Sequence, residues 1–188
     1  MEISWSKLIK NTRSPAAIFN LVRNFIFKLY TIRLLNNGER FDPLVSRRFR
    51  LSDNSSLSRY IWVAEHLRLS DQVLDIACGT GYGTHLLAGF CRAITGVDGH
   101  SQAIDFAKKH YGRGDNIKFI KNDFLFEHQS ADVVVSLETI EHLEIEPVKS
   151  MDHLWSLAKR LLIVSVPYRE PIGHNHHHRH FNLDENSF

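Results

Sequence analysis

Three glycines alternate with other residues just after an apolar run that contains an acid. The segment reads Val73-Leu-Asp-Ile-Ala-Cys-Gly-Thr-Gly-Tyr-Gly83, so Asp75 stands four residues before Gly79. Glycine adopts positive φ readily and lets a ligand approach bare backbone. A helix that begins near Tyr82 would point its unpaired N–H groups into the same space. The segment therefore predicts a strand, a tight turn and a helix N-terminus that together form a nucleotide-sized cradle.

The acid indicates what kind of nucleotide the cradle holds. Dinucleotide sites read G-x-G-x-x-G, and their turn is free to hold a pyrophosphate. Here Gly79, Gly81 and Gly83 follow the spacing G-x-G-x-G, with Asp75 before them. A carboxylate repels a diphosphate and attracts an ammonium or sulfonium group. The pattern therefore favours a nucleoside with a positively charged tail.

The segment from Asp75 to Gly83 resembles the first motif of the class I S-adenosylmethionine-dependent methyltransferases. The resemblance implies S-adenosylmethionine as cofactor and a Rossmann-like, doubly wound α/β sheet of the class I methyltransferase type. Apolar runs alternate with amphipathic segments through the rest of the chain, as an α/β fold requires. After the strand that begins at 73, the expected strands are 93–97, 117–120, 131–136 and 161–166, and the expected helices are 82–90 and 101–110.

Acids follow the second and third of these strands. Asp98 is expected at an exposed strand end, about twenty residues beyond the loop, where an acid can accept hydrogen bonds from both ribose hydroxyls; it can instead cap the next helix. In the family that the chain resembles, an acid after the third strand binds the adenine amino group and an apolar neighbour covers the ring. Asp123 and Phe124 match that pair, although Asp123 alone also suits a turn. The predicted cofactor-binding residues are Asp75, Ala77, Gly79, Gly81, Asp98, Gly99, Asp123, Phe124 and Leu137.

The fourth strand is followed by Glu138-Thr-Ile-Glu-His142. Reacting groups of open α/β sheets gather beyond the carboxyl ends of the strands, and the family often has a Glu-His pair there. An imidazole with an ordinary pKa near ~6.5 can take a proton from a substrate hydroxyl at neutral pH. We therefore predict His142 as the catalytic base and Glu138 as a substrate residue. The alternative is that His142 only caps the turn and shapes the pocket.

A histidine-rich segment, Gly173-His-Asn-His-His-His-Arg-His180, follows the fifth strand. Family members place a substrate loop at this position, so Tyr168, His178 and His180 are predicted to contact substrate or product. No Cys or carboxylate flanks the histidines at ligand spacing, and adjacent loop side chains rarely converge on one ion. No metal site is therefore predicted, and an undirected polar loop is the alternative.

Residues 1–60 differ from the rest and are predicted to be a basic, amphipathic helical segment and cap, ahead of a cofactor domain at 61–188. Every charged residue from Lys7 to Arg33 is basic, and charges at this density exclude a membrane span. Three interpretations remain: a helix packed on the domain, a helix on an anionic membrane surface, or a partner-binding helix.

Gly38-Glu-Arg-Phe41 and Ser58-Arg-Tyr60 resemble segments of bacterial methyltransferases that are often found beside glycosyltransferases, although Ser58 replaces a His. The resemblance implies that this part folds over the cofactor. Arg40 or Arg59 would then meet the methionine carboxylate, because a guanidinium fork matches a carboxylate. Arg59 as a helix-surface charge is the equal alternative.

Composition restricts the partners and the compartment. A net charge of +2 in 188 residues does not suggest a nucleic-acid binder. Cys78 and Cys91 form no disulfide framework, which suits a reducing cytoplasm. The family sheet ends in an antiparallel edge hairpin, and none follows the fifth strand before Phe188. We therefore expect the hairpin to be missing. Either the chain is short or a fragment, or an oligomer covers the exposed edge of the sheet.

These observations predict a methyltransferase that transfers a methyl group to oxygen or nitrogen of a small molecule or sugar-containing precursor. A non-catalytic S-adenosylmethionine-binding or scaffold protein is the first alternative. An NAD-dependent oxidoreductase is the second, and both Asp75 and the glycine spacing argue against it.

Overall fold

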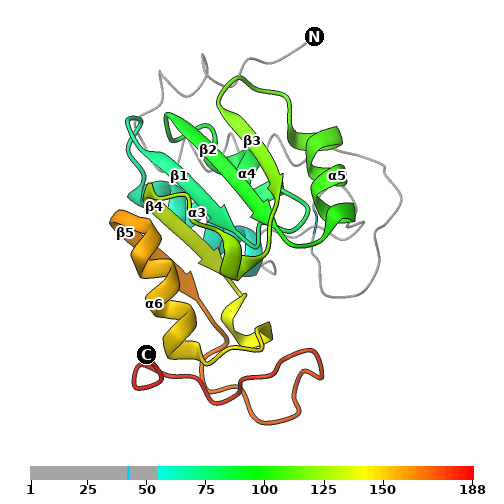
Figure 1. Cartoon of the computed structure of the whole chain (residues 1–188), viewed down its shortest axis with the longest axis vertical. Coiled ribbons are helices and arrows are strands. Elements are labelled where there is room, and N and C mark those ends of the chain that lie inside the picture. Colours follow the sequence, from blue (N-terminus) through cyan, green and yellow to red (C-terminus); the bar gives the residue numbers. More distant parts are fainter. Residues whose placement is uncertain (1–41, 43–54) are drawn as a thin grey trace.

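The computed structural model describes Asp42 and residues 55–188, and it contains one parallel five-stranded sheet with the order β3-β2-β1-β4-β5. Figure 1 shows the sheet with helices on both faces. Arg40, the segment around it and most of the predicted basic helix at 1–60 lie outside the described residues. The predicted domain boundary falls inside a helix, α3 (Ser55–His66), and the boundary itself stays a prediction.

The strands lie where the apolar runs predicted them. They are β1 (Gln72–Ile76), β2 (Ala93–Asp98), β3 (Ile117–Lys121), β4 (Ala131–Leu137) and β5 (Ala158–Ser165). In the interior strand β4, Val133, Val134 and Val135 are fully buried, as expected when both faces of a parallel sheet are covered. The edge strand β5 begins three residues before its predicted start and carries exposed Lys159 and Arg160.

The helices form two layers with separate cores. On one face α3, α4 (Tyr82–Leu87) and α5 (Ser101–Tyr111) pack against Val73 and Ile94. On the other, α6 (Pro147–Leu157) packs its Leu154 and Leu157 against Leu74. Consecutive residues of a strand face opposite sides, so Val73 and Leu74 belong to different cores. The layers make the fold doubly wound, as the resemblance implied.

Several elements differ from the sequence expectations. Helix α4 ends at Leu87 rather than at 90, and α6 was not predicted, although Pro147 occupies the first turn, where proline is favoured. Short 3₁₀ turns follow β3 and β4: η2 (Phe124–Phe126) and η3 (Ile140–His142). Residues 166–188 form no helix or strand and run past the carboxyl ends of β4 and β5 (Figure 1).

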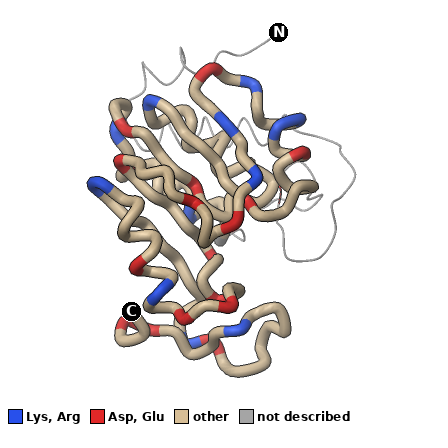
Figure 2. The backbone as a smooth tube through the Cα atoms, viewed as in Figure 1, with Lys and Arg blue, Asp and Glu red and all other residues tan. Residues whose placement is uncertain are grey.

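Within the described residues, β5 pairs only with β4 and lies at one edge of the sheet. Across Asp42 and 55–188, no helix has the length and apolarity to cross a bilayer. Acidic and basic segments are interspersed along the described backbone (Figure 2).

Candidate active site at the carboxyl ends of the strands

A cavity of about 440 Å³ opens where β1, β2 and β4 end. Its size is in the range of small-molecule and cofactor pockets, and its position matches the point where the strand order reverses between β1 and β4, at which open α/β sheets bind ligands. The sequence-predicted residues that line it are Ala77, Gly79, Asp98, Gly99, Asp123, Phe124, Leu137, Glu138 and His142, together with Arg59. Asp75, Gly81, Tyr168, His178 and His180 are not among its lining residues.

The two predicted loop glycines have different tasks. Gly79 has φ 56° and its backbone N–H donates to Asp98 Oδ2 at 2.9 Å; a Cβ there would meet nothing within 4 Å, so the loop is open toward the cavity. Gly81 has φ 85°, and a Cβ there would lie 2.6 Å from Ala107 Cβ on α5. Gly79 therefore keeps space for a ligand, whereas Gly81 lets the loop approach a helix.

Asp75 lies beneath the loop rather than in the cavity wall. Its side chain is buried and accepts hydrogen bonds from Thr84 Oγ1 at 2.6 Å and from Tyr60 OH at 3.4 Å. Burial raises the pKa of this carboxyl to about 7. Asp75 thus ties α3 and α4 to β1.

Asp98 is buried, which corrects the expectation that it lies exposed at its strand end. Oδ2 accepts the N–H of Gly79, and Oδ1 accepts the N–H of His100 at 2.8 Å. Each carboxylate oxygen has two acceptor lone pairs. Asp98 therefore fixes the turn, and it also lines the cavity.

The third strand delivers a polar residue and a ring to the same cavity. Asp123 accepts the N–H of Leu125 at 3.1 Å and so caps the short turn η2. Phe124 follows it and is buried, with its ring against the lining. The capping role and the ligand role that the sequence left open are compatible, because one carboxylate offers several acceptor sites.

Two strand exits that meet at the cavity have non-glycine residues in the left-handed region. Ala77 follows β1 with φ 59°, and Glu138 follows β4 with φ 51°. Conformations of this kind cost free energy and tend to cluster at functional sites. Glu138 is fixed further by two partners: Ser165 Oγ donates to Oε1 at 2.8 Å, and Arg59 lies 3.0 Å from Oε2. Arg59 therefore belongs to the cavity wall.

His142 faces the cavity from η3, and the C-terminal loop packs behind it. Its Nδ1 lies 3.2 Å from the carbonyl oxygen of His177, and its ring meets that of His178 edge-on, with centroids 4.6 Å apart. His180 hydrogen-bonds through Nε2 to the carbonyl oxygens of Leu143 and Ile145 instead. The exposed ring of Tyr168 packs under Arg169. Of the predicted substrate residues, Glu138 and His142 reach the cavity and His178 lies beside His142.

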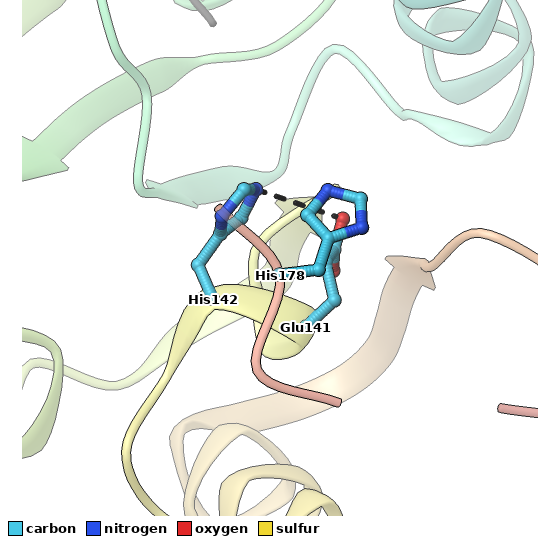
Figure 3. A group of neighbouring side chains, drawn as sticks. All are labelled: Glu141, His142 and His178. Carbon is cyan, nitrogen blue, oxygen red and sulfur yellow. Dashed lines mark ion pairs between the residues drawn. The ribbon is translucent and has the colours of Figure 1, made fainter. Parts of the chain in front are cut away.

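Sequence reasoning missed Glu141, whose buried side chain lies next to His142 and His178 (Figure 3). Neither of its carboxylate oxygens has a hydrogen-bond partner, and burial raises its pKa to about 8. Its backbone carbonyl accepts the N–H groups of Arg179 at 2.7 Å and His180 at 3.1 Å, which holds the loop against η3. The sequence did contain a signal for Glu141, which is the second acid, after Glu138, in the segment that follows β4.

Residues 74–163 match the family model described as "Methyltransferase domain". In this part the chain is similar to a methyltransferase domain. Over 71 residues the chain is 34% identical to probable S-adenosylmethionine-dependent methyltransferases of Mycobacterium tuberculosis and Mycolicibacterium smegmatis, a match that covers 38% of this chain. The chain therefore spans only about a quarter of these relatives, since the match covers 26% and 28% of their lengths.

Solved structures agree on the fold. Magnesium protoporphyrin IX methyltransferase from Synechocystis PCC 6803, with bound SAM, superposes with a TM-score of 0.55 and 25% identity over 69% of this chain and 61% of that one. A Bacillus halodurans C-125 protein described as a putative methyltransferase gives a TM-score of 0.54 at 17% identity, over 64% and 54% of the two chains. The five-stranded order of this domain is thus that of the class I Rossmann-like methyltransferases.

Proposed function

We propose that this chain is an S-adenosylmethionine-dependent methyltransferase that acts on oxygen or nitrogen of a small molecule or a sugar-containing precursor. The observation that carries the proposal is the cavity beyond β1, β2 and β4, in which the glycine loop, Asp98 and Asp123 line one side and Glu138 and His142 the other. The matched family supports the same reaction class.

The residues of the β1–β2 side fit S-adenosylmethionine. Asp98 has acceptor capacity for ribose hydroxyls, Asp123 and Phe124 suit an adenine, and Gly79 leaves its side of the loop open. When bound, this cofactor supplies an electrophilic methyl group on a sulfonium. Asp75 then contributes by holding the loop in place through Thr84 rather than by direct contact.

The charges that line the cavity favour this cofactor over NAD. Asp75, on which the sequence argument relied, is not one of them, because it does not line the cavity. Three carboxylates, those of Asp98, Asp123 and Glu138, line the cavity, and the Arg59 guanidinium there is already paired with Glu138. A pyrophosphate would meet these carboxylates, whereas a sulfonium is attracted by them.

On the acceptor side, His142 is the residue we propose as the base. Its Nδ1 lies 3.2 Å from the His177 carbonyl oxygen, and a proton on Nδ1 that donates to this oxygen would let Nε2 act as the base. Alignment of the acceptor with the methyl group supplies most of the remaining rate acceleration, since good positioning lowers the activation barrier by roughly 7–11 kcal/mol.

The proposal also concerns the cellular compartment and the partners of the protein. Cys78 and Cys91 are both free and buried, which suits a reducing compartment such as the cytoplasm. Coverage of the β5 edge by a second copy and peripheral membrane contact by the basic N-terminal segment stay predictions.

The test is a calorimetric and thermal-shift titration of the whole chain with S-adenosylhomocysteine and, separately, with NAD. We expect binding and stabilisation by the first only; a ligand at 100 times its dissociation constant stabilises by roughly 2.7 kcal/mol. Stabilisation by NAD alone would overturn the proposal. Binding of S-adenosylhomocysteine with no methyl transfer from labelled cofactor to any acceptor in a panel of alcohols, amines and sugars would indicate the non-catalytic alternative.

A further inference from the structure

One carboxylate and two imidazoles from separate parts of the chain converge beside the cavity. Glu141 and His142 come from η3 at the end of β4, and His178 comes from the C-terminal loop (Figure 3). One oxygen of Glu141 and one ring nitrogen of each histidine all lie within 4.8 Å of one another. We propose that Glu141, His142 and His178 form a binding site for a divalent transition-metal ion of the zinc type.

The buried carboxylate is the first reason. The Glu141 side chain is 1% exposed, and both of its oxygens lack a hydrogen-bond partner. Buried polar groups are nearly always paired, and an unpaired carboxylate in an apolar environment is strongly unfavourable. A cation between Glu141 and the histidines supplies the missing partner.

The orientation of the imidazoles is the second reason. His142 Nδ1 faces the His177 carbonyl oxygen, and His178 Nδ1 contacts the Glu170 carboxylate. Metal-binding histidines usually donate one N–H to a carbonyl or carboxylate, which leaves the other nitrogen for the ion. His142 Nε2 indeed lies 4.0 Å from Glu141 Oε1. His178 Nε2 is 2.9 Å from Asn175 Nδ2, a contact that an ion would replace.

The ligand types indicate the metal. Two imidazoles and one carboxylate with open positions form the donor set of catalytic zinc and non-haem iron(II) sites, at distances of about 2.0–2.2 Å. Closing on such an ion requires side-chain movements of about 1 Å from the separations seen here. Magnesium and calcium prefer oxygen ligands, so they fit this set poorly.

No metal site was predicted from the sequence, because the histidine-rich loop has no acid at ligand spacing. The acid comes from the end of β4 instead, and the chain brings it to the loop through the N–H groups of Arg179 and His180 on the Glu141 carbonyl. Only one histidine of the loop, His178, takes part.

The place of the site suggests its task, and this step rests on the proposed function. His142 also lines the cavity, so an open metal position there can hold an acceptor hydroxyl and make its proton easier to lose. The hydroxyl proton then leaves to water, the oxygen bonds the methyl carbon, and the carbon–sulfur bond breaks with its electron pair on sulfur. With an ion bound, Nε2 of His142 would be a ligand rather than a base, so the base assignment made above applies to the metal-free chain.

The binding test uses the whole chain, stripped with a chelator and titrated with Zn²⁺ in a calorimeter. We expect one equivalent to bind, and Glu141→Gln or His178→Asn to weaken binding by about 100-fold or more. Glu170→Gln should weaken it by about 10- to 100-fold, as loss of an outer partner does. His174→Gln and His176→Gln are matched controls, because both side chains are exposed on the same loop outside the cluster; they should leave binding unchanged.

Thermal stability gives a second readout that does not depend on activity. Without metal, Glu141→Gln should be about as stable as the parent, because it replaces a buried carboxyl group that has no hydrogen-bond partner with a neutral amide of the same size. With Zn²⁺ the parent should gain stability and the variant should not, so the parent becomes the more stable of the two. Binding that survives Glu141→Gln, or that falls equally in the two control variants, would mean adventitious chelation by the loop and would overturn the site.

The two proposals fail separately. S-adenosylhomocysteine should bind the chelator-treated chain as well as the zinc-loaded one, since none of its predicted contacts is Glu141, His142 or His178. Loss of zinc binding with retained S-adenosylhomocysteine binding removes only the metal site. Zinc binding without S-adenosylhomocysteine binding removes only the methyltransferase assignment.

Discussion

The two sides of the cavity are assembled in different ways. On the β1–β2 side, the loop after β1 and the acid at the end of β2 lie about twenty residues apart in sequence, and Gly79 and Asp98 hydrogen-bond directly. On the β4 side, Glu138 meets Arg59 from α3 and Ser165 from β5, and His142 meets His178 from the C-terminal loop. The first side is local and rigidly tied by backbone N–H groups, whereas the second depends on contacts between distant segments.

Under the proposed function, this difference separates cofactor binding on one side of the cavity from acceptor binding on the other. A side built from consecutive elements can hold the same cofactor whatever surrounds it. A side built from a loop and strand exits can change its acceptor when that loop changes, which is why binding residues so often lie on loops held by a rigid scaffold. Substitutions on the two sides should therefore move different measured quantities.

The largest effect is expected from His142→Ala on the β4 side. Turnover with an acceptor should fall by about 10²- to 10⁴-fold, while the affinity for S-adenosylhomocysteine stays within about twofold of the parent's, because the cofactor contacts lie on the other side. Steady-state kinetics and calorimetry measure the two quantities. A raised Michaelis constant with unchanged turnover would instead mean that His142 only shapes the pocket. His176→Ala, exposed on the same loop as His178, is the control.

Asp98→Ala should produce the opposite pattern on the β1–β2 side. Affinity for S-adenosylhomocysteine should fall by about 10- to 1000-fold, because charge-assisted bonds are worth roughly 1.5–3 kcal/mol each. The free energy of unfolding should also fall by about 1–3 kcal/mol, since the N–H groups of Gly79 and His100 lose their acceptor.

Asp132→Ala is the matched control for Asp98. Asp132 also accepts a backbone N–H, that of Gln72 at 2.8 Å, but it lies at the opposite end of the strands. It should lower stability without changing the affinity for S-adenosylhomocysteine. An Asp98 variant with unchanged affinity would leave the residue only its turn-fixing role and would remove the contrast between the two sides.

The local side is also the part that the sequence predicted best. Five apolar runs gave five strands, because each run and the acid after it lie within a few residues. We did not predict that the Asp75 side chain points away from the cavity. The alternation of side chains along β1 does indicate it: Asp75 shares a face with Val73, toward α3 and α4, and not with Leu74. A pattern of charges shows which residue is acidic but not where its carboxylate points.

The β4 side was predicted less completely for a physical reason. Nothing near His178 in sequence indicates that it will meet Glu141 and His142, because the meeting depends on loop contacts such as those of His180 with Leu143 and Ile145. Helix α6 was not predicted in the same region, and its buried face is carried by only a few residues, among them Leu154 and Leu157. Convergence of distant segments is a tertiary property, and local periodicity does not report it.

Asp75 also gives the local side a pH dependence. Its pKa is about 7 in the folded chain, against an ordinary value of 3.8. The folded state therefore holds a proton that the unfolded chain releases, and the contribution to stability, complete below pH 4, is lost as pH rises to about 7. Each pKa unit corresponds to about 1.4 kcal/mol, so the loss amounts to a few kcal/mol.

Denaturant unfolding of Asp75→Asn and the parent from pH 4 to pH 8 tests this. The variant should gain stability relative to the parent as pH rises, by a few kcal/mol, and the difference should level off above about pH 7. A difference that stays constant with pH would mean that Asp75 is ionised in the folded chain, and its charge would again be available to attract a cationic ligand.

The smallest effect concerns the backbone at the β1 exit, where Ala77 has φ 59°. Glycine removes the steric cost of the left-handed conformation but loses more conformational entropy on folding, a penalty of roughly 0.5–1 kcal/mol. The two terms nearly cancel, so Ala77→Gly should change the free energy of unfolding by less than about 0.5 kcal/mol. In Ala88→Gly, at φ −55°, only the entropy penalty applies, and we expect a loss of about 0.5–1 kcal/mol. Equal losses in the two variants would show that the β1 exit carries no strain, and the strained exits would then be a property of Glu138 and the β4 side alone.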